Sequence, residues 1–169
     1  MKWYAISGSW RRGNDELNLN VKETVSRIIS EGNGILTGGA LGVDDVATTT
    51  VLHNGSPSKQ LRIYLPVSLE RYTKHLWKRA EERVITNQQA DSLTYRLSHL
   101  KEHFPECIID NTSFKDVNPE SYYARIDRIV GECDELHAFH VNDSEGVGYS
   151  IDKAKEMGKP VHVKKYYIK

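Results

Sequence analysis

Short apolar runs alternate with stretches of helical periodicity along the whole chain, and this alternation constrains the fold more than any other feature. The runs that we interpret as strands lie at residues 3–7, 35–37, 61–65, 107–109, 135–141 and 160–163. Between them, apolar residues recur three or four positions apart, as in Leu17, Val21, Val25 and Ile28. Strands that alternate with helices form a parallel sheet covered on both faces. The sequence therefore predicts an α/β fold, a three-layer α/β/α sandwich with a mainly parallel sheet.

The length of 169 residues suits one domain that spans residues 1–169. Residues 72–119 are the least regular part and are expected to form a helical insertion in place of a short crossover. An insertion of this kind either lies over a site as a lid or covers the edge of the sheet. Its amphipathic segments, 72–84 and 93–104, could also provide the surface of a homo-oligomer.

The charge balance argues against a strongly basic nucleic-acid-binding protein, because 23 Lys and Arg residues face 23 Asp and Glu residues. A local basic patch remains open at Arg11-Arg12 and at the C-terminal residues 164–169.

The two cysteines, Cys107 and Cys133, form no metal or redox motif and are expected to be buried free thiols. No run has the length of a signal peptide or membrane span, so we expect a cytoplasmic protein without a membrane partner.

Two glycine-bearing turns stand where a buried strand should end and a helix should begin. The first is Ser7-Gly8-Ser9, and the second is Gly38-Gly39-Ala40-Leu41-Gly42. At such a point the free backbone N–H groups and the helix dipole favour a phosphate or another anion. Three glycines in five residues also let the backbone approach a ligand closely. The alternative for the second turn is a tight turn without a ligand.

Neither turn matches a common nucleotide-binding motif. Residues 8–13 have the glycine spacing of a P-loop, but Asn14 and Asp15 replace its Lys and Ser/Thr, and no Gly-x-Gly-x-x-Gly follows the first strand. Asp44 and Asp45 fall in the first turn of the next helix, where a carboxylate either caps backbone N–H groups or binds a ribose hydroxyl.

A third turn, residues 142–152, again joins a strand to a helix. Gly146, Gly148 and Ser150 could form a second anion cradle that faces the first, or the segment could be an ordinary turn with a helix cap. Arg125 lies on the preceding helix, where its guanidinium could hold a phosphate or pair with a neighbouring carboxylate. No metal site is indicated.

With these motifs the chain resembles the SLOG superfamily. This Rossmann-like group unites the DNA-processing protein DprA, YpsA-like proteins and the Lonely Guy phosphoribohydrolases, which are also called lysine-decarboxylase-like proteins. The strongest match is Gly-Gly-Ala-x-Gly-Val-Asp-x-x-Ala at residues 38–47, which is closer to the DprA and YpsA-like branches. A looser similarity runs over residues 125–163, so about two thirds of the chain is covered.

The resemblance implies a Rossmann-like fold with a nucleotide pocket across the carboxyl ends of the strands. Its ligand-facing turns fall on Ser7, Gly8, Ser9, Gly38, Gly39, Gly42 and Asp44. The hydrolytic branch uses an arginine and the glutamate of a Pro-Gly-Gly-x-Gly-Thr-x-x-Glu motif. Here Asp152 stands at the spacing of that acid, but the Pro, the first Gly and the Thr are missing. Asp is also one methylene shorter, which matters for a proton donor that must come within about 3 Å of its target.

Three functional hypotheses follow. The first is binding of a nucleotide or nucleotide-like molecule, without a further cofactor. The second is a metal-independent nucleoside-monophosphate N-glycosidase, in which Arg125 steadies the phosphate and Asp152, or alternatively Asp44 or Asp45, assists departure of the base. The third, single-stranded DNA binding, is disfavoured by the neutral composition but stays open.

Overall fold

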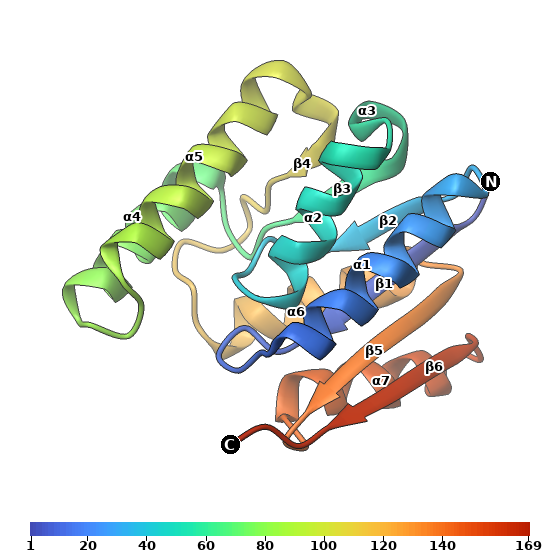
Figure 1. Ribbon diagram of the computed structural model, residues 1–169. Helices are drawn as coiled ribbons and strands as arrows, with labels where there is room; N and C mark the ends of the chain where they lie inside the picture. The colour runs from blue at the N-terminus through green and yellow to red at the C-terminus, as the bar shows by residue number, and fades with distance from the viewer.

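The computed structural model describes residues 1–169 and contains one six-stranded, all-parallel sheet with the strand order β4-β3-β2-β1-β5-β6 (Figure 1). The strands are β1 (Trp3–Gly8), β2 (Gly34–Thr37), β3 (Leu61–Tyr64), β4 (Ile108–Ile109), β5 (Glu135–Val141) and β6 (Val161–Tyr166). The helices are α1 (Asp15–Ser30), α2 (Val43–Asn54), α3 (Pro57–Gln60), α4 (Leu69–Glu81), α5 (Asn87–His103), α6 (Pro119–Glu132) and α7 (Glu145–Glu156), with a 3-10 turn, η1 (Pro105–Cys107). The α/β prediction is confirmed, and the sheet is wholly rather than mainly parallel.

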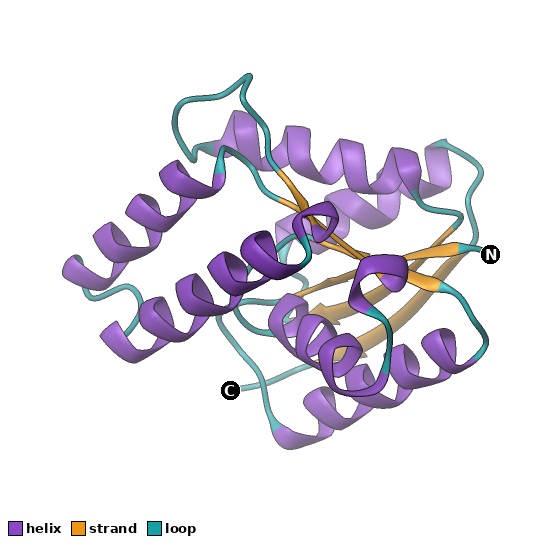
Figure 2. Ribbon diagram, turned by 90° about the horizontal axis from the view of Figure 1, so that it is seen from above, coloured by secondary structure: helices purple, strands orange, loops and turns teal.

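Helices cover both faces of the sheet, as expected for buried parallel strands (Figures 1 and 2). Successive residues of β1 point to opposite sides, so Ile6 joins the core beneath α1, α2, α4 and α5, whereas Ala5 joins the core beneath α6 and α7. The same alternation places Ile35 in the first core and Leu36 in the second. None of the helices combines the length and the apolar character that a membrane crossing requires.

The order of the strands reverses direction at β1, and this places a crevice beside its carboxyl end. From β1 the chain passes through α1 to β2 on one side, whereas β5 pairs with β1 on the other side, from Tyr4 opposite Glu135 to Gly8 opposite Phe139. In open α/β sheets, ligands bind at the carboxyl ends of the strands next to such a switch point. The fold therefore directs attention to the turns that follow Gly8, Thr37 and Val141.

Local signals in the sequence explain where the helices begin. Asn14 caps α1 by accepting a hydrogen bond from the Leu17 amide, and Asn118 caps α6, in which Pro119 occupies the first turn. Helix α5 begins six residues before Leu93, the first apolar residue of its sequence pattern, because Thr86 and Gln89 form a reciprocal capping box.

Residues 72–119 contain most of α4 together with α5, η1 and β4. Helices α4 and α5 form an antiparallel hairpin that projects from one end of the sheet (Figure 1). An ion pair from Arg96 of α5 to Asp45 of α2 links the hairpin to the body of the fold. The segment thus extends the sheet by β4 and also places α4 next to the glycine turn.

Gly42 allows the first two glycine turns to pack against each other. Its φ is +75°, and a Cβ at this position would lie 2.3 Å from the carbonyl oxygen of Ser9 and 2.8 Å from Cα of Trp10. The next amide, from Val43, donates to the same Ser9 carbonyl at 3.1 Å. A side chain at residue 42 would therefore separate the two turns.

We expect Gly42→Ala to lower the free energy of unfolding much more than Gly158→Ala. Gly158 has a similar φ of +70° but no atom within 4 Å of its added Cβ, so it reports the backbone strain alone, about 1–2 kcal/mol. The steric clash at residue 42 should add at least about 2 kcal/mol to that strain. Urea unfolding of both variants measures the difference, and equal losses would contradict the packing of the two turns.

Candidate functional site

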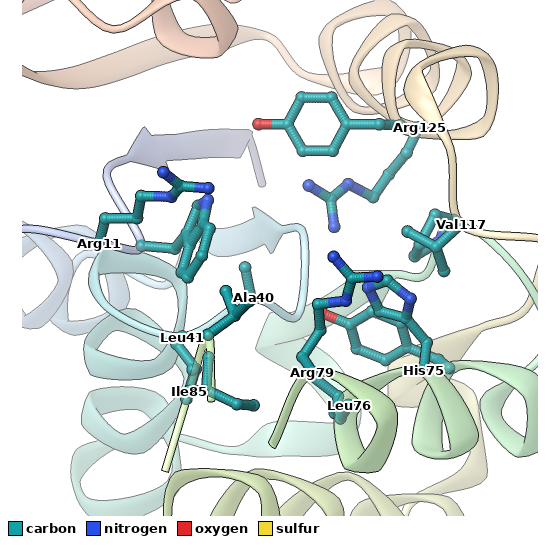
Figure 3. Close-up of a pocket in the computed structure, with 14 residues that line it drawn as sticks. Arg11, Ala40, Leu41, His75, Leu76, Arg79, Ile85, Val117 and Arg125 are labelled. Carbon is teal, nitrogen blue, oxygen red and sulfur yellow. The ribbon is translucent and has the colours of Figure 1, made fainter. Parts of the chain in front are cut away.

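A pocket of about 210 Å³ opens at the carboxyl end of the sheet, between the glycine turn and helix α4 (Figure 3). One wall comes from the loop after β1 and from the turn after β2, and the opposite wall comes from α4 and the start of α6. The lining residues are Trp10, Arg11, Ala40, Leu41, Pro66, Tyr72, His75, Leu76, Arg79, Val84, Ile85, Val117, Tyr122 and Arg125.

The pocket is electropositive, because three arginines and no carboxylate line it. The guanidinium groups of Arg79 and Arg125 point toward its centre (Figure 3). Arg79 Nη2 pairs with Glu82 at 2.9 Å, whereas its buried Nε has no hydrogen-bond partner. Burial lowers the pKa of His75, and the charges of Arg79 and Lys78 lower it further, although the carboxylate of Glu82 acts in the opposite direction. An anionic group is the ligand that these walls favour.

Arg125 is the most constrained of the three arginines. It is only 6% exposed, and its Nη1 donates to the carbonyl oxygen of Gly38 at 2.7 Å. Its guanidinium lies 4.7 Å from the centre of the Tyr122 ring, a cation–π contact. Its Nε is buried without any hydrogen-bond partner. A buried guanidinium with an unused donor is costly unless a ligand supplies an acceptor.

Gly38 separates Arg125 from a buried carboxyl group, Asp44. A Cβ at residue 38 would lie 2.9 Å from Asp44 Oδ2 and 3.0 Å from Arg125 Cζ, so only glycine fits between them. Asp44 is 7% exposed and accepts a hydrogen bond from the Ala40 amide at 3.2 Å. Burial raises the pKa of Asp44, although the charge of Arg125 and the Ala40 amide act in the opposite direction.

The amide of Ala40, a residue of the predicted ligand-binding turn, donates to Asp44. Ala40 still lines the pocket. The amides of Gly39, Leu41 and Gly42 donate to no protein group, and Leu41 also lines the pocket. The turn thus keeps unused donors, but the internal carboxylate occupies its central amide.

Several other predicted residues surround a second, smaller cavity of about 30 Å³. Arg125 and Tyr122 line both cavities and lie between them. The Ser7 hydroxyl contacts the Ser150 hydroxyl at 3.4 Å, which joins the end of β1 to α7. The predicted residues at this cavity are Ser7, Gly8, Gly38, Asp44 and Ser150.

The remaining predicted ligand residues line neither cavity. The carbonyl oxygens of Ser9 and Gly39 are engaged internally, by the Val43 amide at 3.1 Å and by the Tyr72 hydroxyl at 3.1 Å. The main roles of Gly42 and Gly146 are in packing, against Ser9 and against the Tyr122 hydroxyl respectively. A Cβ added at Gly148 would lie 3.9 Å from the ring of His140, an ordinary van der Waals contact.

The structure does not bring the predicted catalytic pair together. Asp152 is exposed on α7 and lines neither cavity, whereas Arg125 is buried between them. Asp152 therefore has the sequence spacing of the family's acid but does not lie at either cavity. Asp45, the other alternative acid, is engaged in its ion pair with Arg96.

Sequence reasoning missed the wall that α4 provides. The sequence places Tyr72 and Leu76 only within the amphipathic segment 72–84, and no motif in it singles out His75 or Arg79. Their one signal is that His75 and Arg79 lie three and seven residues after Tyr72, on neighbouring surface of the same helix. Trp10 follows directly after the first glycine turn, and Tyr122 precedes Arg125 by three residues.

The raised pKa of Asp44 predicts a pH dependence of stability. Because folding raises this pKa above the value of about 3.9 in unfolded chains, the protonated carboxyl stabilises the fold, and this contribution is lost as the pH rises through the folded-state pKa. Asp44→Asn keeps an acceptor for the Ala40 amide but does not titrate. From about pH 4 toward neutral pH, the free energy of unfolding of the wild type should therefore fall relative to that of this variant. A difference that stays constant or changes in the opposite direction would contradict the buried position.

No protein-family model matches the sequence, and no curated protein matches it. Among solved structures, the chain is similar to DprA from Helicobacter pylori, described for its single-stranded DNA binding mode, with a TM-score of 0.66 and 20% identity over 96% of this chain and 64% of that one. DprA from Streptococcus pneumoniae gives a TM-score of 0.66 and 17% identity over 96% of this chain and 50% of that one. The protein TM1055 gives a TM-score of 0.57 and 15% identity over 95% of this chain and 72% of that one.

The chain thus spans 64% and 50% of the two DprA chains. At these identities the likeness concerns the arrangement of helices and strands. It confirms, for the fold, the resemblance that the Gly-Gly-Ala-x-Gly-Val-Asp stretch carries in the sequence. The chain adopts a Rossmann-like fold that it shares with the two DprA structures.

Proposed function

We propose that this protein binds a nucleotide in the pocket between the glycine turn and α4, with a phosphate at Arg125. The observation that carries the proposal is the buried guanidinium of Arg125, whose Nε lacks an acceptor beside a pocket without carboxylates. A phosphate offers the acceptor oxygens and the negative charge that this group lacks. Arg79, which also points into the pocket, supplies a second charged contact.

The other walls suit the base of a nucleotide. Trp10, Tyr72 and Tyr122 contribute aromatic surface, and Leu41 and Leu76 contribute aliphatic surface. Flat bases bind through stacking on aromatic rings, with little dependence on which base is present. The Arg11 guanidinium lies 4.6 Å from the centre of the Trp10 ring, which stabilises one orientation of the indole.

The location also agrees with the proposal, since the pocket lies at the carboxyl ends of the parallel strands β1, β2 and β3. Hydrolysis of the N-glycosidic bond is not part of the proposal, because Asp152 is exposed outside both cavities. Binding requires only the charge, the unused donors and the aromatic walls.

Calorimetric titration with a panel of nucleoside monophosphates tests this function. Arg125→Gln should weaken binding at least about tenfold, because a charge-assisted hydrogen bond contributes about 1.5–3 kcal/mol. Arg125→Lys should restore only part of the affinity, since an ammonium cannot replace the guanidinium fork. Arg128→Gln is the matched control, because Arg128 lies on the same helix, is exposed and pairs with Glu132. Failure of every monophosphate to bind, or equal effects at residues 125 and 128, would contradict the proposal.

A second candidate is single-stranded DNA, favoured by a wider hollow of about 550 Å³ that adjoins the pocket. It shares Trp10 and Arg11 with the pocket and adds Arg12 and Lys169, so cations and an aromatic ring follow one another along the surface. A groove of this composition holds a phosphate backbone while bases stack. The similar DprA from Helicobacter pylori is described as binding single-stranded DNA, which supports this second proposal.

Titration of a labelled oligothymidine in a series of salt concentrations tests this candidate. The logarithm of the association constant should fall linearly with the logarithm of the salt concentration, and Arg12→Gln should reduce that slope by about one phosphate contact. Because Arg12 does not line the nucleotide pocket, monophosphate binding should stay unchanged. An affinity that does not respond to salt, or the absence of binding, would exclude DNA.

A further inference from the structure

A second basic hollow, of about 350 Å³, adjoins the nucleotide pocket on the outer side of α4. It is lined by Arg71, Lys74, His75, Lys78, Arg79, Lys115, Asp116 and Val117. Three of these residues, His75, Arg79 and Val117, also line the nucleotide pocket, so the two hollows are neighbours that share a wall. Five cationic side chains therefore face a single carboxylate next to the site.

This concentration of charge stands out in a chain whose net charge is zero. Lys74 and Lys78 lie four residues apart on one helix face, and like charges at this spacing destabilise a helix. Glu70 pairs with Lys74 at 3.3 Å and Glu82 with Arg79 at 2.9 Å. The ammonium groups of Lys78 and Lys115, in contrast, have no acidic partner within ion-pair distance. An anion would relieve this repulsion.

The walls of the hollow are held together without a ligand. Arg71 Nη1 donates to the carbonyl oxygen of Lys115 at 3.3 Å, which ties the segment before α6 to helix α4. The amide of Leu69, the first residue of α4, donates to Asp110 at 2.7 Å, and Lys101 of α5 contacts the same carboxylate at 2.9 Å. These contacts fix the loop opposite α4, so the hollow exists before any ligand binds.

We propose that this hollow is the subsite for the outer phosphates of a nucleoside polyphosphate whose first phosphate lies at Arg125. This assignment rests on the proposed function and names the ligand class. Arg79 lines both hollows, and its buried Nε has no partner, so it is placed to contact the phosphate chain where it passes from one hollow to the other. A monophosphate would reach only the inner arginines, whereas a triphosphate would also meet Lys78 and Lys115.

The test compares mono-, di- and triphosphates of one nucleoside by calorimetry, without divalent cations, in the wild type and in the double variant Lys78→Gln/Lys115→Gln. In the wild type, affinity should rise at least about tenfold from mono- to triphosphate, as expected for two added charged contacts. The double variant should lose most of this gain and keep the monophosphate affinity. Lys22→Gln/Lys155→Gln, which removes the same charge from exposed residues of α1 and α7, should behave as the wild type.

The outcomes separate this inference from the proposed function. Equal affinity for mono- and triphosphate, or a gain that survives in the double variant, overturns the outer subsite, while a monophosphate affinity that still depends on Arg125 leaves the nucleotide pocket standing. Inorganic tripolyphosphate that binds as tightly as the nucleoside triphosphate overturns the nucleotide as the ligand of both hollows. If no nucleotide binds, both proposals fail.

Discussion

The burial of the Arg125 guanidinium against the carbonyl oxygen of Gly38 is the constraint on which the site depends. Removal of a guanidinium from water costs several kcal/mol unless its donors and its charge are compensated. Asp44 lies on the other side of Gly38, but it forms no direct ion pair with Arg125, and its own burial raises its pKa. The protein thus brings two ionisable groups out of water and leaves one donor of the guanidinium, Nε, without an acceptor.

Much of the surrounding architecture follows from holding this group in place. Parallel pairing of β1, β2 and β5 brings the turn at Gly38 and the start of α7 to the carboxyl end of the sheet. Helix α6, which carries Arg125, packs on the same face of the sheet as α7. Gly38 leaves room for the carboxyl and the guanidinium, and Gly42 lets the preceding loop approach. The α4–α5 hairpin, anchored by Arg96 on Asp45, then forms the outer wall of the pocket. A rigid frame with one unsatisfied donor at its centre is a frame preorganised for an anion.

The fold could be predicted from the sequence because its signals are local. Apolar runs, the caps Asn14 and Asn118, and the glycine turns each report on a few consecutive residues, and together they specify alternating strands and helices.

The site could be predicted only in part. Glycine spacing located the turn, but it could not indicate that Asp44 would take the Ala40 amide. Motif spacing also failed to show whether Asp152 would reach the site, because spacing along the chain does not determine which face of a helix an acid lies on. In the structure Asp152 is exposed to solvent. The wall from α4 depends on how a hairpin of two helices packs at the end of the sheet, which is a tertiary property that no local pattern encodes.

The most direct test of the buried, incompletely compensated Arg125 is a crystal structure of the protein soaked with a nucleoside monophosphate. The account predicts density for a phosphate within hydrogen-bond distance, about 3 Å, of the Arg125 guanidinium, and for a base against the ring of Trp10, Tyr72 or Tyr122. Density for the nucleotide elsewhere on the surface, with Arg125 turned to pair directly with Asp44, would contradict it.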